Sequence, residues 1–145
     1  AAPAVGLLPL VGYAQSESPL IYLSPIKSDG QLSRCQAEVW FVGEGSDFYV
    51  VTANDAWRAQ AVESGLDQAR VWVGDVGQWR SSRGKYLDLP SVETKAKIVE
   101  DATEHARMLT RFGEKYSAEW SSWGPRFKRG LADGSRVMLR YSPVA

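Results

Sequence analysis

Two short apolar segments joined by a glycine-rich loop constrain the fold of this chain more than any other feature of its sequence. Gln36–Val42 and Phe48–Ala53 predict paired strands, and the loop GEGSD at 43–47 supplies the glycines and short polar residues of a hairpin. Large apolar side chains occupy both faces of the first strand: Ala37, Val39 and Phe41 on one, Trp40 and Val42 on the other. Such a strand is typical of a barrel that is filled inside and covered outside.

The flanking segments predict further strands and a short helix. Strands are expected at Pro19–Lys27, at Ala69–Gly74, once or twice within Gly77–Leu89, and at Gly134–Ser142. Asn54 or Asp55 is expected to cap a short helix whose apolar residues recur at helical spacing as far as Leu66.

A long helix is expected to begin at Pro90-Ser91, with Ser91 as its N-cap. Apolar residues recur every three or four positions from Val92 to Tyr116, which is the spacing of an amphipathic helix. Gly113 predicts a break, after which a second short helix can reach Trp123. This order of elements favours a mostly antiparallel barrel, mainly β with helices (α+β), formed by a single domain over residues 15–145.

Residues 1–14 form an uncharged, largely apolar segment that precedes this domain. The segment is too short to cross a bilayer as a helix, which needs about 20 residues, so no stable membrane insertion is expected. Gly12 and Ala14 stand at the −3 and −1 positions of a cleavage site, and the segment resembles the end of a secretory signal peptide. Its Ala and Gly content favours a twin-arginine signal, which predicts export to a bacterial periplasm. The alternative is an apolar arm that packs on the domain or on a second subunit, in a cytoplasmic protein.

Composition excludes several classes of function. Seventeen Lys and Arg residues balance seventeen Asp and Glu residues, whereas a DNA-binding protein usually carries a basic excess, so no nucleic-acid partner is expected. The chain has one cysteine, Cys35, and one histidine, His105, which excludes an intramolecular disulfide and metal centres built from several of either residue. The usual nucleotide-binding and hydrolase motifs are missing. The catalytic residues stay unknown, and a cofactor is expected to carry any chemistry.

A more specific pattern begins at Arg34. This basic residue precedes a strand with the aromatic pair Trp40-Phe41, the partner strand ends in Thr52, and Arg58 follows in the short helix. The arrangement resembles the pyridoxamine 5′-phosphate oxidase-like FMN-binding split β-barrels, near the branch of the deazaflavin-dependent nitroreductases. The strand with Arg70 and Trp72 and the closing segment 137–143 are similar to strands of the same family.

The resemblance implies an antiparallel split β-barrel of six to seven strands with one short and one long helix. It also implies a flavin-dependent oxidoreductase that acts on a small-molecule substrate, as a homodimer with its cofactor between the subunits. FMN is favoured over F420 because the Gly-Arg-Lys-Ser-Gly segment common in the deazaflavin branch is absent. Ala56 stands where the family has a serine that contacts the cofactor phosphate.

Eight residues are candidates for cofactor binding: Arg34, Trp40, Thr52, Arg58, Arg70, Trp72, Arg126 and Lys128. Arginine suits a phosphate because its planar fork matches two phosphate oxygens, and the tryptophans can line an apolar slot for the ring. Arg126 and Lys128 belong to the segment WGPRFKRG at 123–130, which is interpreted as a loop over a phosphate or an anionic substrate. The alternative for each residue is structural: a core tryptophan, a solvated charge or a solvated loop.

Two other functions fit the same residues. One is a binding module without catalysis, for haem, F420 or another aromatic ligand. The other is a domain whose apolar arm and aromatic side chains serve assembly alone.

Overall fold

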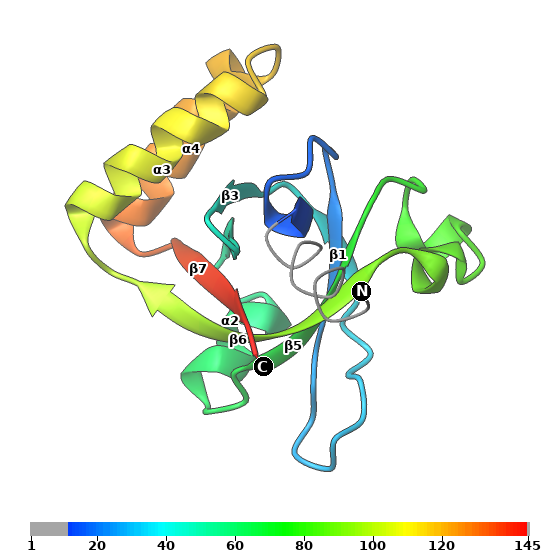
Figure 1. Cartoon of the computed structure of the whole chain (residues 1–145). Coiled ribbons are helices and arrows are strands. Elements are labelled where there is room, and N and C mark those ends of the chain that lie inside the picture. Colours follow the sequence, from blue (N-terminus) through cyan, green and yellow to red (C-terminus); the bar gives the residue numbers. More distant parts are fainter. Residues whose placement is uncertain (1–11, 145) are drawn as a thin grey trace.

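One antiparallel sheet of seven strands dominates the computed structural model, which describes residues 12–144 (Figure 1). The strands are β1 (Ile21–Pro25), β2 (Ala37–Val39), β3 (Val42–Glu44), β4 (Asp47–Ala53), β5 (Gln68–Val73), β6 (Ser91–Val99) and β7 (Arg136–Pro143). The other elements of the described residues are the helices α2 (Trp57–Glu63), α3 (Ala102–Lys115) and α4 (Trp120–Asp133) and the 3₁₀ turns η1 (Trp79–Ser81) and η2 (Lys85–Asp88). Figure 1 shows α3 and α4 side by side, to one side of the sheet.

The sheet curls until its two edges meet. The strand order is β2-β1-β5-β6-β7-β4-β3, which places β2 and β3 at opposite edges. In the chain, only Trp40 and Phe41 separate Val39 at the end of β2 from Val42 at the start of β3. Because neighbouring Cα atoms are about 3.8 Å apart, the two edges are at most about 11 Å apart at this point. The sheet is therefore a split barrel, and the α+β split-barrel prediction is confirmed.

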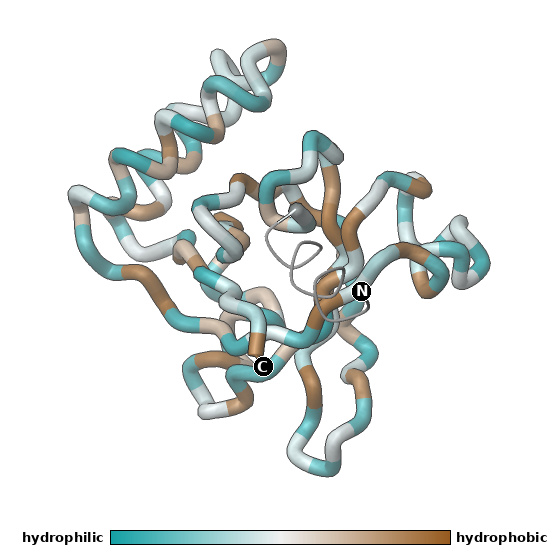
Figure 2. The backbone as a smooth tube through the Cα atoms, in the orientation of Figure 1, coloured by the Kyte–Doolittle hydropathy of each residue, from teal (hydrophilic) through white to brown (hydrophobic). Residues whose placement is uncertain are grey.

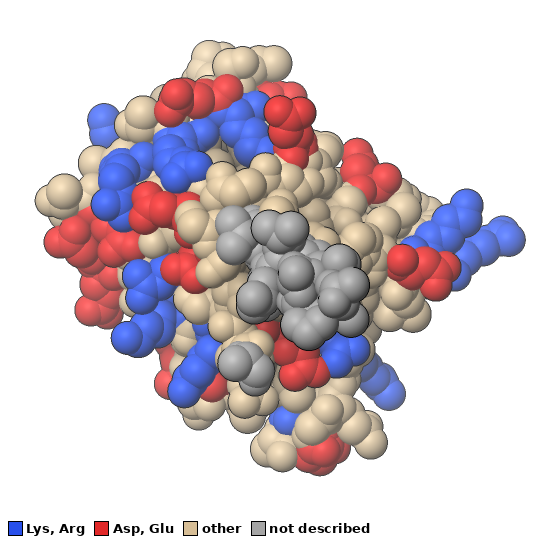
Figure 3. Space-filling view, viewed as in Figure 1, with Lys and Arg blue, Asp and Glu red and all other residues tan. Residues whose placement is uncertain are grey.

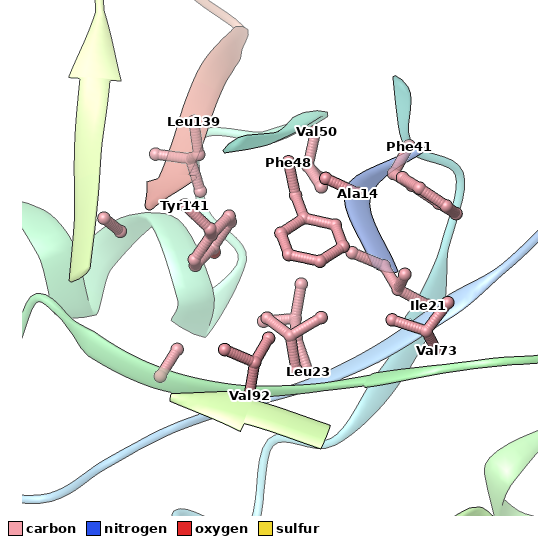
Figure 4. Packing of buried hydrophobic residues seen from close by; sticks show 13 residues of the cluster. Ala14, Ile21, Leu23, Phe41, Phe48, Val50, Val73, Val92, Leu139 and Tyr141 are labelled. Carbon is pink, nitrogen blue, oxygen red and sulfur yellow. The ribbon is translucent and has the colours of Figure 1, made fainter. Parts of the chain in front are cut away.

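Apolar side chains cover both faces of the sheet, as the pattern of the first hairpin predicts. Figure 4 shows the interior core, where Phe48 of β4 packs with Leu139 and Tyr141 of β7. Neighbouring residues of the same strands, such as Tyr49 and Met138, face outward and pack against α3 and α4. The hydrophobic stretches follow the strands of the barrel in Figure 2.

The predicted long helix from Ser91 is wrong in its first third, because Ser91–Val99 forms strand β6. Buried and exposed residues alternate along β6, which pairs with β5 on one side and β7 on the other. Val92 and Ala96 are four residues apart, a spacing that fits a helical turn and a strand equally well. Helix α3 begins only at Ala102, where the Asp101 carboxylate accepts a hydrogen bond of 2.8 Å from the Glu104 amide.

Three other expected elements take a different form. The expected strand Gln36–Val42 is divided into β2 and β3, because its two halves pair with different strands. The segment Gly77–Leu89 forms the turns η1 and η2 and no strand. The expected loop 123–130 lies inside α4, so the described residues contain two long helices where the sequence predicted one.

The expectations for residues 1–11 lie outside the described residues. Of the segment that follows, Ala14 is buried in the interior core, and Tyr13 packs against that core. The approach is close, since a Cβ atom at Gly43 of β3 would lie 1.7 Å from the Ala14 carbonyl oxygen. Within residues 12–144, none of the helices has the length and apolar character required to span a membrane.

Candidate functional site

An open groove with aromatic walls lies where the two edges of the sheet meet. Its volume is about 260 Å³, and it is lined by Val39, Trp40, Val51, Trp123, Phe127 and Arg136. These residues come from β2, from the Trp40-Phe41 link, from β4 and β7, and from α4. We call this the aromatic groove.

Trp40 forms a rigid wall of the aromatic groove. Its ring stacks on the ring of Tyr116, with centroids 4.2 Å apart and an angle of 6° between the planes. The rings of Trp123 and Phe127 meet it edge-on, at centroid distances of 6.1 and 6.3 Å. Stacked and edge-to-face contacts of this kind hold aromatic side chains in fixed orientations, so the wall is formed before any ligand binds.

The hydroxyl group of Tyr116 fixes the link that carries Trp40. It accepts a hydrogen bond of 3.0 Å from the buried amide of Phe41 and lies 2.9 Å from the carbonyl oxygen of Pro19. Burial raises the pKa of Tyr116 to about 12, so the hydroxyl keeps its proton at neutral pH. The closure of the barrel and the position of Trp40 therefore depend on the same side chain.

Arg136 provides positive charge in the aromatic groove, and Arg126 lies beside the groove over the ring of Trp123. The Cζ atom of Arg136 lies 5.3 Å from the ring centroid of Phe127 and 5.8 Å from that of Trp123, and Cζ of Arg126 lies 4.9 Å from the latter. Gly130 makes room for this packing, because a Cβ atom there would lie 2.6 Å from the Arg136 side chain. Within the described part of the chain, neither guanidinium forms a salt bridge. The groove can therefore hold a flat apolar group that carries a negative charge.

Thr52, near the end of β4, and Arg58, in the helix α2 that follows, lie on the interior side of the barrel. Thr52 follows the groove residue Val51 but faces the interior, where its buried hydroxyl has no hydrogen-bond partner. Nε of Arg58, in α2, is also buried without a partner. Helix α2 starts after Ala56, which offers no side-chain cap, whereas the sequence predicted a cap at residue 54 or 55. Unpartnered buried polar atoms are rare in native proteins and often mark a ligand or water site.

Other predicted cofactor residues lie elsewhere on the barrel. Arg70 faces outward from β5 and pairs with Glu93 at 2.5 Å. Trp72 is buried and meets Tyr86 edge-on at a centroid distance of 5.1 Å. Arg34 is exposed in the loop before β2. The structure does not bring these side chains into the aromatic groove.

Arg126 and Lys128, the two predicted cofactor-binding residues in α4, lie beside different grooves. Arg126 reaches the aromatic groove through Trp123, whereas Lys128 borders a separate apolar groove between α3 and α4, beside Trp120 and Pro125. Of the eight candidates, Trp40 therefore lines the aromatic groove, and Arg126 lies beside it over the ring of Trp123. Thr52 faces the interior, and Arg58 lies near the buried Tyr141 of that interior.

Sequence reasoning did not assign Val51 or Arg136 to a site, and it included Phe127 only as part of the expected loop 123–130. A usable signal was present in α4, where Trp123, Phe127 and Gly130 are spaced by four and three residues, as on one face of a helix. The contribution of Arg136 had no such signal, because its position depends on how β7 enters the sheet beside β4.

No protein-family model matches this chain, and no curated protein matches it in sequence. Its fold is similar to solved structures over nearly its whole length. HutZ, the haem storage protein of Vibrio cholerae, is 17% identical over 99% of this chain and 89% of its own, with a TM-score of 0.62. A Listeria innocua protein provisionally assigned as a pyridoxamine 5′-phosphate oxidase is 12% identical over 97% of this chain and 93% of its own, with a TM-score of 0.58.

An F420 reductase is also similar: it is 15% identical over 91% of this chain and 92% of its own, with a TM-score of 0.51. At these identities the similarity establishes the fold alone. The chain has the pyridoxamine 5′-phosphate oxidase-like split-barrel fold that its sequence predicted.

Proposed function

We propose that this protein is a flavin-dependent oxidoreductase that binds FMN and acts on a small molecule. The observation that carries the proposal is the aromatic groove, which joins a preformed aromatic wall at Trp40 to the unpaired guanidinium of Arg136. A flavin ring is flat, apolar on its faces and polar at one edge, which matches this combination.

The residues of the aromatic groove fit the ring of the cofactor. Trp40 and Trp123 would pack against the ring, and Arg136 would offset negative charge on it. The phosphate is assigned to Arg58, as the family resemblance implies, and the buried Nε of Arg58 has no partner that it would have to give up. When bound, FMN supplies hydride exchange with the substrate; the chain itself provides binding, orientation and exclusion of water.

The size of the aromatic groove supports a second subunit in the site. Its volume of about 260 Å³ lies below the roughly 300–1,000 Å³ of sites that enclose a small ligand. A second copy of the chain, packed over the open side, would complete the enclosure. We therefore include a homodimer in the proposal, with one aromatic groove contributed by each subunit.

A titration of the cofactor-free protein tests the proposal. We expect FMN to quench the tryptophan fluorescence in a saturable manner at micromolar concentration and the complex to be yellow. Riboflavin, which lacks the phosphate, separates the two parts of the site. Arg58→Ala should weaken FMN binding by about 10- to 100-fold and leave riboflavin binding unchanged, because one charge-assisted contact to the phosphate is lost. Trp123→Ala should weaken the binding of both ligands.

Arg70→Ala is the matched control, since it removes an exposed arginine whose partner is Glu93. This variant should bind FMN like the parent protein. If neither FMN nor F420 quenches the fluorescence at micromolar concentration, the flavin proposal is wrong. Equal effects of Arg58→Ala on FMN and riboflavin would show that Arg58 does not bind the phosphate.

A binding module without catalysis is the second candidate, because Arg136 is the only charged residue that lines the described groove. Haem is the less favoured ligand for it. The groove residues include no histidine, cysteine, tyrosine or methionine to bind the iron, and Nε2 of His105 is 2.6 Å from the Val99 carbonyl oxygen. F420 is then the favoured ligand of a binding module. Titration with F420 in parallel with FMN discriminates between the two cofactors. An assay for flavin reduction by a nicotinamide donor then separates an oxidoreductase from a binding module.

A further inference from the structure

A second cleft opens on the other side of the Trp40-Phe41 link. It has a volume of about 480 Å³ and shares no lining residue with the aromatic groove. Its lining residues are Ala14, Gln15, Ser16, Glu17, Val42, Gly43, Arg111, Glu114 and Lys115. Figure 3 shows that Lys and Arg side chains gather with Asp and Glu side chains over α3, the helix that supplies three of these residues. We call this the lysine cleft.

The amine of Lys115 is held in a partly buried position in the lysine cleft. Its Nζ atom donates a hydrogen bond of 3.0 Å to the Phe41 carbonyl oxygen and lies 3.5 Å from the centroid of the Phe41 ring. Burial lowers the pKa of Lys115 to about 8. A much larger fraction of this amine is therefore neutral near pH 7 than of an exposed lysine, and the neutral amine is the nucleophile.

Arg111 gives the lysine cleft a second cation on the same face of α3. Residues 111 and 115 are four apart, so their side chains are neighbours along the helix. The Arg111 guanidinium lies 3.7 Å from Glu44 and is about one-third exposed, which leaves donors free for a ligand. Glu17 and Glu114 also line the cleft, and their charges limit how much negative charge a ligand can carry. When Lys115 is neutral, Arg111 is the one cation among the lining residues, so a ligand can place at most a single carboxylate, and only beside Arg111.

We propose that the lysine cleft binds small carbonyl compounds that carry a carboxylate, and that Lys115 forms an imine with them. The neutral Nζ atom forms a bond to the carbonyl carbon as the carbon–oxygen π bond breaks. The two amine protons leave with the carbonyl oxygen as one molecule of water, and no electrons are gained or lost. Arg111 pairs with the carboxylate and so aligns the carbonyl carbon with the amine.

Reductive trapping with glyoxylate tests this proposal in the folded, full-length chain. Glyoxylate is the smallest aldehyde with a carboxylate, and cyanoborohydride converts its imine to a stable carboxymethyl group that peptide mass mapping locates. We expect Lys115 to be labelled at least about tenfold faster than Lys95, whose side chain is 63% exposed, because burial in the cleft lowers the pKa of Lys115. After unfolding in urea, the two rates should become equal.

Two variants separate reactivity from recognition. Lys115→Arg keeps the charge and should remove the fast labelling while leaving the circular dichroism spectrum unchanged. Arg111→Met should slow labelling by glyoxylate several-fold and leave labelling by acetaldehyde, which has no carboxylate, unchanged. If Lys115 is labelled no faster than Lys95, the proposal that Lys115 is a reactive amine is wrong. If Arg111→Met changes the labelling rates by glyoxylate and by acetaldehyde equally, the proposal that Arg111 binds the carboxylate is wrong. Since the two clefts share no residue, neither result bears on FMN binding.

Discussion

Replacement of Tyr116 by phenylalanine tests whether one hydroxyl group holds the barrel closed. The hydroxyl accepts a 3.0 Å bond from the Phe41 amide and lies 2.9 Å from the carbonyl oxygen of Pro19 and 3.1 Å from that of Phe41. The substitution removes one oxygen atom and leaves the ring that stacks on Trp40. Any loss of stability therefore reports the polar contacts and not the packing.

The expected loss follows from the partners that the hydroxyl leaves behind. Phe41 is fully buried, so its amide would be left without a hydrogen bond and without access to water. Such a group costs about 1–3 kcal/mol. The carbonyl oxygens of Pro19 and Phe41 also lose the hydroxyl as a donor, but this loss destabilises the fold less. Pro19 is exposed to water, and the Phe41 carbonyl keeps its hydrogen bond from Lys115. We expect Tyr116→Phe to lower the free energy of unfolding by about 2 kcal/mol.

Urea denaturation monitored by tryptophan fluorescence and circular dichroism measures this loss. Tyr86→Phe is the matched control, because the hydroxyl of Tyr86 bonds the side chain of Gln36, which can turn to water after the change. Tyr86→Phe should lower the free energy of unfolding by less than about 1 kcal/mol. A Tyr116 variant as stable as the Tyr86 variant would refute the reasoning that the hydroxyl fixes the link between the two sheet edges.

Two further predictions concern pH and close packing. The lowered pKa of Lys115 means that between pH 8 and 10 the unfolded chain keeps a proton that the folded chain has lost. The free energy of unfolding should therefore rise over this interval, by on the order of 1–2 kcal/mol after allowance for solvent screening, and the rise should vanish in Lys115→Met. Above pH 10 it should fall again, because the raised pKa of Tyr116 makes the unfolded chain lose its proton first. Gly43→Ala should destabilise the fold by about 2–3 kcal/mol in thermal or urea unfolding, since its Cβ atom would overlap the Ala14 carbonyl, whereas Gly12→Ala, which meets no atom within 4 Å, should be nearly neutral.

The strands with a regular alternation of residues could be predicted from the sequence. The hairpin around 43–47, the strand at Ala69–Gly74 and the last strand all appear near the expected positions. The motif from Arg34 to Arg58 also sufficed to identify the split-barrel fold. These features are local: the alternation of residues and the glycine-rich loop act over a few positions, which is the range that sequence patterns describe.

The candidate site was predictable only in part. The motif fixes the spacing of Trp40, Thr52 and Arg58; of these, Trp40 lines the aromatic groove, whereas Thr52 faces the interior and Arg58 lies near the buried Tyr141. Arg70 was included by the same motif, but strand β6 brings Glu93 opposite it, and the two charges pair. A sequence pattern cannot show which charge a neighbouring strand supplies.

The sequence by itself determined that this chain forms a barrel covered on both faces. Its single cysteine and single histidine also exclude an intramolecular disulfide and a metal centre built from several of its own histidines. Only the tertiary structure decided that Ser91–Val99 is a strand, that β2 and β3 separate at Trp40, and that α4 forms across Gly124 and Pro125. The physical reason is the same in each case. Local preferences there are weak or contradictory, so the backbone takes the conformation that pairs it with distant strands or buries its aromatic side chains.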